Sequence, residues 1–476
     1  MMAKKNHKQR YDEAISYISE PMLPKTDQAF SLKTVAHAYD ILKKPLWNTP
    51  TFLVAGTNGK GSVCGILYTL LQQRGLSAGL YTSPHLHSFA ERCQYSQHPI
   101  SEEDLYDHVL SLKTKLPTEL FGNLSAFERL TLASFLCIAS HNPDVVVIEV
   151  GLGGDQDATN VVLADISIIT SIGYDHTAIL GKTLSQIATK KAAIRRPNAP
   201  LLLGKGCLRP SLKSFWKQLE HRPLYVPSST ILDGLREYFQ SHSWPAYLPQ
   251  ALPRSWRSEH AAPFLKKHVM LENLALAVQA LCVFEKHKNY LSFAHLLQHT
   301  PPSLPASFRG RGEVWQIHHR KNAHIYLDVA HNSHAMEHAF AHFEHLRAQM
   351  YNSSHQHSSH QHSSHQDHPK MALLSLLADK DVPAILTLAQ TTFDRIILFY
   401  HPSPRCLHES SVELGNRATS HNNKDNTASI VWCHHFKEAF ELFCHDLGDA
   451  NMGYVGGCFA AVRRVMNHLA VTSFCF

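Results

Sequence analysis

Residues 56–62 (GTNGKGS) form a glycine-rich segment that could bind a phosphate group. Glycines let a backbone turn so that several N–H groups point at one spot, and a following helix adds partial positive charge there. Lys60 adds a full positive charge, and the Ser62 hydroxyl could contact a phosphate oxygen or a magnesium ion. The strict GxxxxGK[ST] pattern fails because Gly61 separates Lys60 from Ser62, so an ordinary tight turn stays open as the alternative.

Three further side chains with suitable chemistry lie at the ends of apolar runs. Ser83 lies in TSPH, Glu149 ends DVVVIEV, and His176 lies in the DHT that follows DISIITSI. In an open parallel sheet, ligands bind beyond the carboxyl ends of the strands. Magnesium prefers oxygen ligands, which makes Ser83 and Glu149 candidate metal ligands. The imidazole of His176 is an unusual magnesium ligand, and a helix-capping or core histidine is the alternative.

The segments around residues 56–62 predict the elements that must position these groups. Residues 51–55 (TFLVA) are a short apolar run typical of a buried strand, and residues 62–74 carry apolar side chains at helical spacing. Gly75 stands where helices commonly stop, and residues 78–81 are a second apolar run. Strand, helix and strand in this order predict a βαβ unit with parallel strands, which favours the phosphate-loop interpretation over the tight turn.

The alternation continues along the chain and divides at residues 300–305 (TPPSLP). Before that point we expect strands over 144–150, 165–172 and 200–204 and helices over 127–139 and 268–285. After it we expect strands over 325–329, 371–376, 395–400, 429–432 and 452–455 and helices over 334–348, 382–390, 436–445 and 459–469. The prediction is an α/β fold: a P-loop ATPase-like domain with a mostly parallel sheet over residues 1–299, and a smaller Rossmann-like α/β domain over residues 300–476.

A histidine-rich tract interrupts the second predicted domain. Residues 353–369 repeat the pentad SSHQH and contain six histidines. Such a sequence has almost no apolar area to bury, so we predict a disordered insertion over residues 352–369. Neutral imidazoles also bind zinc, nickel and copper, and a metal-binding role is the alternative.

Composition excludes several classes of protein. The 476 residues are 44% hydrophobic and 18% charged, which suits a globular chain with a sizeable core. A net charge of +6 over this length predicts no nucleic-acid-binding surface. The polar start, the absence of an apolar run long enough to span a membrane, and ten cysteines without a CxxC pair predict a cytoplasmic protein.

Eight motifs occur in an order that resembles one enzyme family: VAGTNGKGSV, YTSPHL, FERLT, EVGLGG followed by DATN, SIGYDHTAILGKTLSQIA, GRGEV, DVAHN and LADKD. The chain resembles the folylpolyglutamate synthases, in particular the bacterial dihydrofolate synthase/folylpolyglutamate synthases, a branch of the Mur ligase family. The resemblance implies an ATP-dependent, ADP-forming ligase. In such an enzyme the carboxylate of dihydropteroate, or the γ-carboxylate of a folate, forms an acyl phosphate that the amine of L-glutamate then attacks.

The resemblance also implies a role for individual residues, carried over motif by motif. The implied ATP-binding residues are Asn58, Gly59, Lys60, Gly61, Ser62, Asn273, Arg311 and Asp328. The implied magnesium ligands, for two ions, are Ser62, Ser83, Glu149, His176 and a carbamylated Lys191. The implied substrate-contacting residues are Arg92, Phe127, Glu128, Asp157, His331 and Cys458, with Lys60, Lys191 and His331 expected to act in catalysis. Without the resemblance, Lys191 reads as a solvated charge on a helix.

Several positions depart from the family pattern. Asp155-Gln156 replaces the usual Arg-Leu, and Lys190 replaces a usual glutamate before Lys191. Cys458 stands where the family has a serine, and residues 31–35 (SLKTV) replace a Gly-Leu-Glu-Arg-Val loop that binds dihydropteroate in bifunctional members. These departures fall on substrate-contacting positions, so the pterin specificity is the least constrained part of the prediction.

Three alternative functions stay open at this point. The chain could be a folylpolyglutamate synthase only, a Mur-type ligase of another substrate, or a P-loop kinase or ATPase that performs no ligation. The second domain, with Arg311, Asp328 and His331, favours a ligase over a kinase, and we expect ATP to bind between the two domains. The expected partners are small-molecule substrates, with no nucleic acid and no membrane, and the expected state is a monomer.

Overall fold

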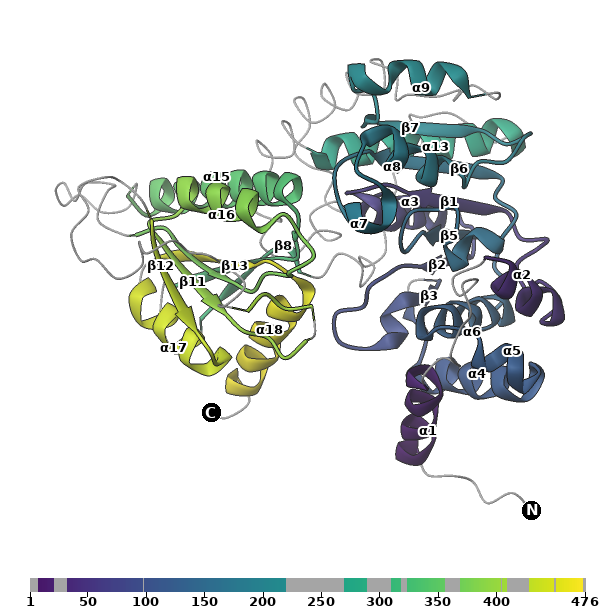
Figure 1. Cartoon of the computed structure of the whole chain (residues 1–476), viewed down its shortest axis with the longest axis horizontal. Helices are drawn as coiled ribbons and strands as arrows, with labels where there is room; N and C mark the ends of the chain where they lie inside the picture. The colour runs from purple at the N-terminus through teal and green to yellow at the C-terminus, as the bar shows by residue number, and fades with distance from the viewer. Residues whose placement is uncertain are drawn as a thin grey trace. The chain divides into compact units, whose positions relative to one another are not determined.

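The chain folds into two α/β units (Figure 1). The structure, a computed structural model, describes residues 7–20, 32–96, 98–219, 269–288, 310–317, 323–355, 369–403, 405–408, 428–448 and 451–473. Unit 1 holds the described residues up to 219 together with residues 269–288, and unit 2 holds the described residues from 310 onward. The predicted boundary at 300–305 lies outside the described residues.

Unit 1 is built on a seven-stranded sheet with the order β4-β3-β2-β5-β1-β6-β7. Its five parallel strands are β1 (Thr51–Ala55), β2 (Ala78–Tyr81), β5 (Val145–Glu149), β6 (Ile166–Ser171) and β7 (Leu201–Gly206). Two short antiparallel strands, β3 (Cys93–Tyr95) and β4 (His98–Pro99), extend one edge. The carboxyl ends of β2, β5, β1 and β6 therefore lie side by side, as the prediction of one shared ligand edge requires.

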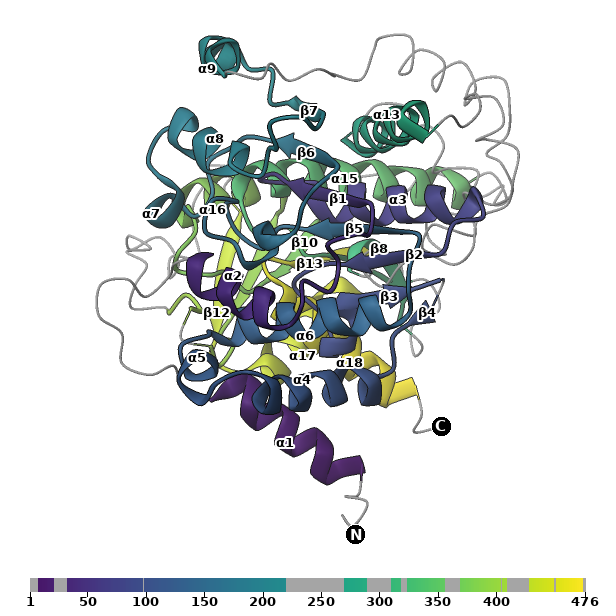
Figure 2. The same ribbon diagram turned by 90° about the vertical axis from the view of Figure 1, so that its right-hand side faces the viewer.

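Helices cover both faces of this sheet and enclose two apolar cores. On one face, α3 (Lys60–Gln73) packs against α13 (Val269–Lys288) over β1, β5 and β6. On the other face α6 (Ala126–Ser140) covers β2 and β3, and α4 (Glu102–Lys115) and α1 (His7–Ser19) pack outside it (Figure 2). The other α-helices among the described residues of unit 1 are α2 (Leu32–Ile41), α5 (Thr118–Gly122), α7 (Thr177–Leu180), α8 (Leu184–Ala192) and α9 (Lys213–Gln218).

Local sequence explains where the helices near the ligand edge begin. Ser125 and Glu128 form a reciprocal capping box at the start of α6, and Thr183 and Gln186 form another at the start of α8. Each box satisfies backbone N–H groups that a helix start otherwise leaves without partners. The side chains that precede and enter these helices therefore keep fixed positions.

Unit 2 is built on a six-stranded sheet with the order β12-β11-β10-β13-β9-β8. The parallel strands are β9 (His324–Asp328), β10 (Met371–Leu374), β11 (Arg395–Phe399), β12 (Ser429–Cys433) and β13 (Met452–Gly456), and β8 (Arg311–Gln316) pairs antiparallel with β9. The helices are α15 (Ser333–His355), α16 (Val382–Thr392), α17 (Phe436–Leu447) and α18 (Phe459–Ser473). Buried Tyr326, Tyr454 and Phe343 pack ring against ring in its core.

The predicted α/β class and its two sheets are confirmed, and every predicted strand and helix is present with its ends moved by a few residues. The largest difference is α15, which we expected to end at residue 348 and which continues to His355. Residues 352–355 are therefore helical, and the prediction of a disordered insertion is wrong for them, because adding a residue to an existing helix costs far less than starting one. The rest of the tract, residues 356–368, lies outside the described residues.

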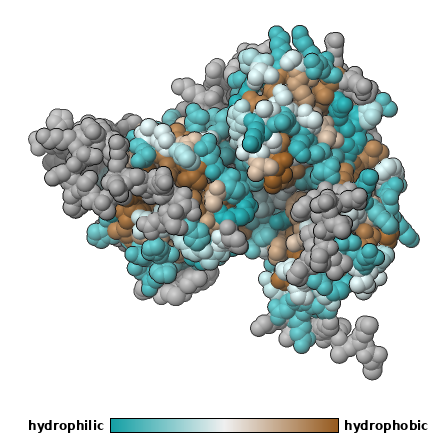
Figure 3. All heavy atoms as spheres, viewed as in Figure 1, coloured by the Kyte–Doolittle hydropathy of each residue, from teal (hydrophilic) through white to brown (hydrophobic). Residues whose placement is uncertain are grey.

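The surface is mixed in character. Figure 3 shows hydrophilic residues over much of the visible face, with smaller hydrophobic areas between them. Among the described residues, no helix is both long enough and apolar enough to cross a membrane.

Candidate functional site

The loop between β1 and α3 depends on two glycines. Gly56 has φ +154°, and a Cβ there would collide with the hydroxyl of Thr170. Gly59 has φ +85°, caps α3, and would place a Cβ 2.8 Å from Asn273 Oδ1. Side chains are disfavoured at both positions by backbone conformation as well as by space. Asn273, predicted to contact ATP, therefore lies directly against the phosphate loop.

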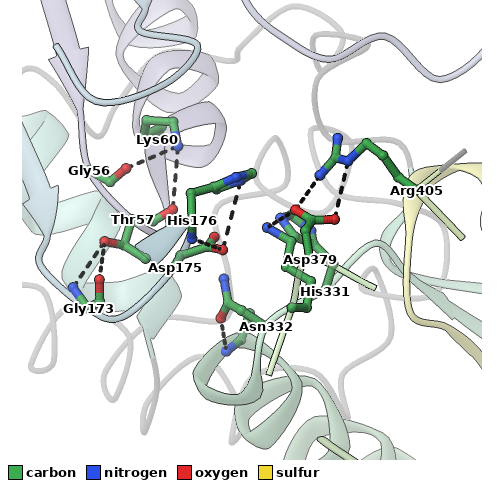
Figure 4. Close-up of polar contacts among 12 residues, drawn as sticks. Gly56, Thr57, Lys60, Gly173, Asp175, His176, His331, Asn332, Asp379 and Arg405 are labelled. Atoms are coloured by element: carbon green, nitrogen blue, oxygen red, sulfur yellow. Dashed lines mark hydrogen bonds and ion pairs between the residues drawn. The ribbon is translucent and has the colours of Figure 1, made fainter. Parts of the chain in front are cut away.

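The end of β6 holds the same loop in place. Ser171 Oγ accepts a hydrogen bond of 3.0 Å from Asn58 N, and Thr170 Oγ1 donates one of 2.6 Å to Asn58 O. Thr57 Oγ1 accepts a 3.0 Å bond from Gly173 N (Figure 4). These contacts hold the loop from the neighbouring strand and the residues that follow it.

Two lysines converge on one carbonyl oxygen of this loop. Lys60 Nζ lies 3.1 Å and Lys191 Nζ 2.9 Å from Gly56 O (Figure 4 shows the Lys60 contact). Lys191 is only 3% exposed. Burial, and then the nearby charge of Lys60, lower the pKa of Lys191 from 10.5 to about 7. Two closely spaced amines are suited to an anion, and phosphate is the anion that such loops bind.

Ser83 and Glu149 meet at the neighbouring strand ends. Ser83 N donates a 3.0 Å hydrogen bond to Glu149 Oε2, and the Ser83–Pro84 peptide bond is cis. Glu149 is 3% exposed and stands opposite Val54 in the pairing of β5 with β1. The backbone of Ser83 and the carboxylate of Glu149 are thus brought together beside the strand that carries the phosphate loop.

His176 occupies a strained position after β6. It has a left-handed backbone with φ +48° and precedes α7. Its backbone N donates to Asp175 Oδ1 at 2.9 Å, and its Nε2 lies 3.8 Å from the same oxygen (Figure 4). Non-glycine residues adopt this conformation at a cost and often at functional sites, which agrees with a site role but does not identify one.

Asp157 organises the glycine-rich loop after β5. It is buried and accepts hydrogen bonds from Leu152 N at 2.7 Å and from both Thr159 N and Thr159 Oγ1. Burial raises the pKa of Asp157, although these hydrogen bonds oppose the increase. A Cβ on Gly151 would contact the ring of Phe127, which places that predicted substrate residue against the same loop.

Arg92 lies at the start of the antiparallel extension. Its Nε donates to His85 Nδ1 at 3.1 Å, and its guanidinium lies 5.9 Å from the ring centre of Phe127. One of its two terminal nitrogens, Nη1, is buried without a hydrogen-bond partner. Arg92 and Phe127 are therefore neighbours, and the guanidinium retains donor capacity for an anionic ligand.

Glu128 has a structural role that the motif did not reveal. Its carboxylate accepts a 2.6 Å bond from Ser125 N and completes the capping box of α6. It is 7% exposed. Its predicted contact with substrate stays a prediction, and the capping bond gives an independent reason for glutamate at this position.

The predicted residues of unit 2 gather at the carboxyl ends of β9 and β13. Asp328 accepts hydrogen bonds from Ala330 N at 2.8 Å and Gly312 N at 2.9 Å, and burial raises its pKa to about 6. Nδ1 of His331 lies 2.9 Å from Val329 O. Arg311 lies 5.9 Å from the ring centre of Phe459. Asp328 thus ties the strand that begins with Arg311 to the loop that carries His331.

Cys458 sits at the turn from β13 into α18. Gly457, with φ +97°, makes this turn, and a Cβ there would lie 2.5 Å from Ser375 O. Burial raises the pKa of the Cys458 thiol, against opposing hydrogen bonds from the backbone of Ala461 and Ala460. The thiol is thus engaged with the first turn of α18, where the family has a hydroxyl.

Glu149 offers the kind of oxygen ligand that magnesium prefers. Among the described residues, no group of three or more histidine, cysteine, aspartate or glutamate side chains is placed to hold a metal. Magnesium is commonly bound by one or two carboxylates together with phosphate oxygens and waters, and Glu149 could supply one such carboxylate.

Several contacts at the site were not anticipated from sequence. Arg129 is fully buried and donates to the backbone oxygens of Tyr17, Glu20 and Phe121, which anchors α1 to α6. Both family departures at 155 and 190 face each other, with Lys190 Nζ 3.4 Å from Asp155 Oδ2. Lys190 and Asp155 are 35 positions apart in sequence, and the partners of Arg129 in and just after α1 are more than a hundred positions away. No pattern of neighbouring residues could therefore have predicted either contact.

Comparisons with known proteins agree with these features. Residues 54–199 match the Mur ligase middle domain. The dihydrofolate synthase/folylpolyglutamate synthase of Buchnera aphidicola subsp. Baizongia pistaciae is 30% identical over 69% of this chain and 71% of its own length. The protein of the same name from Bacillus subtilis is 41% identical over 60% of this chain and 65% of its own length. A similar match at 41% identity, from the Acyrthosiphon pisum subspecies of Buchnera, spans 41% of that relative.

Solved structures extend the similarity over nearly the whole chain. The bifunctional folylpolyglutamate synthase/dihydrofolate synthase of Yersinia pestis, complexed with AMPPNP and Mn ion, aligns with a TM-score of 0.69 at 25% identity and covers 96% of this chain and 98% of its own. E. coli FolC in complex with DHPP and ADP aligns with a TM-score of 0.68 at 22% identity and covers 98% of both chains. With its two α/β units, its phosphate loop and these relatives, the chain belongs to the dihydrofolate synthase/folylpolyglutamate synthase family of ligases.

Proposed function

We propose that this chain uses ATP to join L-glutamate to dihydropteroate, to the γ-carboxylate of a reduced folate, or to both, and releases ADP and phosphate. The observation that carries the proposal is the pair of lysines on Gly56 O in a loop held by β6, within a chain whose relatives bear these activities in their names. The reaction passes through an acyl phosphate. The substrate carboxylate takes the γ-phosphoryl group of ATP, and the amine of glutamate then displaces phosphate and loses a proton.

The proposed task of the phosphate loop is charge neutralisation and alignment. Phosphoryl transfer to a carboxylate brings two anions together, so positive groups that are already in place lower the barrier. Lys60 and the backbone N–H groups at the start of α3 supply such groups, and Asn58, Gly61 and Ser62 complete the lining. Asn273, which packs on Gly59, is placed to contact the nucleotide from α13.

The proposed metal site lies beside this loop. Glu149 and Ser83 would bind one magnesium ion, and Ser62 and His176 are the further ligands that the family pattern assigns. A bound magnesium ion supplies positive charge to the phosphate oxygens. Glu149 keeps the charge balance because its carboxylate offsets one of the two charges of the ion.

Lys191 is proposed to react with carbon dioxide. Burial lowers the pKa of its amine to about 7, so the neutral form that can attack CO2 is accessible near neutral pH. The neutral amine forms a new N–C bond to CO2 and releases one proton, and the product is an anionic carbamate able to bind a second metal ion. Starting from the protonated lysine, two protons leave in all. The carbamate would also end the repulsion between Lys191 and Lys60.

The remaining roles rest on placement. Arg92 and Phe127 lie beside the glycine-rich loop that Asp157 organises, and they are proposed to contact the carboxylate-bearing substrate. In unit 2, Arg311 and Asp328 are proposed to contact ATP, and His331 and Cys458 to contact glutamate. A monomeric state and a cytoplasmic location stay predictions.

One experiment separates the candidate functions. Purified protein is incubated with ATP, magnesium and L-glutamate, and dihydropteroate or tetrahydrofolate is offered separately, while ADP and product mass are followed. Product from both pterins identifies a bifunctional enzyme, and product from tetrahydrofolate alone identifies a folylpolyglutamate synthase. ADP without any glutamylated product would overturn the ligase proposal and favour an ATPase.

A further inference from the structure

The exposed side of α15 carries two histidines one helical turn apart. His334 and His338 stand at positions i and i+4 of this 23-residue helix, and their ring centres are 4.8 Å apart. His334 is exposed and His338 is half-buried. Residues four apart on a helix face the same direction, which is the arrangement in which two imidazoles share one metal ion in helical zinc sites.

The separation of the rings suits chelation. A zinc ion about 2.1 Å from one nitrogen of each ring, with about 90 to 110° between the two bonds, puts the ring centres roughly 4.5 to 5.2 Å apart. The observed 4.8 Å lies inside this range. The two rings meet edge to face with an interplanar angle of 76°, and because His334 is exposed, water can complete the coordination.

The other histidines of α15 do not share this arrangement. His342 continues the same helix face but is buried, and its Nδ1 lies 2.7 Å from Tyr326 OH. His345 is half-buried and lies seven residues, about two turns, beyond His338. The pair at the start of α15 is thus distinct from the aromatic core and from Glu149 in unit 1.

We propose that His334 and His338 form a two-histidine site for a divalent transition metal such as Zn²⁺ or Ni²⁺. Imidazole nitrogen is a preferred ligand of both ions, whereas Mg²⁺ prefers oxygen. A helix brings the two side chains together only when the chain is folded. Metal binding at this site therefore stabilises the folded protein.

The test is thermal unfolding of the full-length protein with and without ZnCl2 or NiCl2. At a metal concentration ten times Kd, the wild-type Tm should rise by about 3 to 6 °C, from the relation between occupancy and folding free energy for a unit of this size. His338→Asn and His334→Asn should each lose this rise, and His345→Asn, on the same helix, should keep it. MgCl2 at the same concentration should not reproduce it.

The histidines of residues 356–368 are present in every variant, so the difference between variants isolates the pair on α15. Slower hydrogen exchange at the start of α15 on zinc addition, in wild type and not in His338→Asn, would support the same site directly. An equal Tm rise in wild type and His338→Asn, or no rise in either, would overturn the proposal.

Discussion

Replacing Lys191 with methionine should stabilise the protein while it abolishes ligation. Lys191 is 3% exposed and its pKa falls from 10.5 to about 7, so folding buries a cation at a cost. One pKa unit corresponds to about 1.4 kcal/mol, and the cost at pH 7 is therefore about 4 kcal/mol. Methionine fills similar space without charge. It forgoes the 2.9 Å bond to Gly56 O, worth about 1 kcal/mol, and the expected net gain is about 3 kcal/mol.

The dependence on pH identifies the cause. The unfolded chain holds the Lys191 proton up to about pH 10.5, and the folded chain releases it near pH 7, so wild-type stability from this group rises with pH between the two values. At about pH 9.5 the residual cost is about 1 kcal/mol, and the advantage of Lys191→Met should nearly vanish. Urea unfolding of both proteins in CO2-free buffer at the two pH values measures this difference.

Two controls accompany this measurement. Lys190→Met removes the neighbouring lysine, whose side chain is about one-third exposed and pairs with Asp155, so it should change stability by less than about 1 kcal/mol at either pH. Bicarbonate should stabilise wild type and leave Lys191→Met unchanged, because only the wild type can form the carbamate. The reasoning is refuted if Lys191→Met is less stable than wild type at pH 7, or if its advantage is the same at both pH values.

Three further substitutions test the separate parts of the proposed site. Lys60→Ala should reduce ligation with either pterin by about 100-fold or more. Folding should change little, because β6 holds the loop through contacts that do not involve this side chain. Near-normal turnover would remove the phosphate-loop assignment. Glu149→Gln should raise the magnesium concentration needed for half-maximal rate more than it raises the KM for pterin, since the amide keeps the shape and loses the charge; an unchanged magnesium titration would contradict the metal site. Arg311→Ala should lower kcat/KM by about 10-fold or more, because charge-assisted contacts to phosphate are lost. The Tm of the protein without ligands should be nearly unchanged. Normal kinetics would make Arg311 an ordinary surface residue.

The fold was predictable wherever strands are buried on both faces. Residues 51–55 and 145–149 are mostly apolar runs because helices cover both sides of the sheet. A buried strand could therefore be predicted for each run from the sequence alone. Strands β3 and β4, of three and two residues, are too short to show a period and could not be predicted from it. β8 was missed because glycine and charge interrupt the alternation that marks a strand.

The site was predictable in its strand-end residues and not in its long-range contacts. Ser83 and Glu149 end neighbouring parallel strands, and topology alone brings such positions together. From sequence, Lys191 resembles a surface charge because it follows another lysine near the end of a helix. It is buried because α8 packs against the glycine-rich loop after β5, at Gly154. Arg129 is likewise buried, and its bonds to backbone oxygens of Tyr17 and Glu20 join positions more than a hundred residues apart, which no local pattern reveals.

The unusual spacing of the phosphate loop has a physical consequence. With Gly61 between Lys60 and Ser62, Lys60 is the first residue of α3, and its amine folds back onto Gly56 O and Thr57 O. A second amine reaches the same carbonyl from α8, so the positive charge of the site comes from two segments more than a hundred residues apart. Because burial lowers the pKa of Lys191 to about 7, the net charge beside the phosphate loop can change with pH, and the proposed carbamate would make it depend on CO2 as well. The loop therefore supplies a fixed shape, and α8 supplies the adjustable part of its charge.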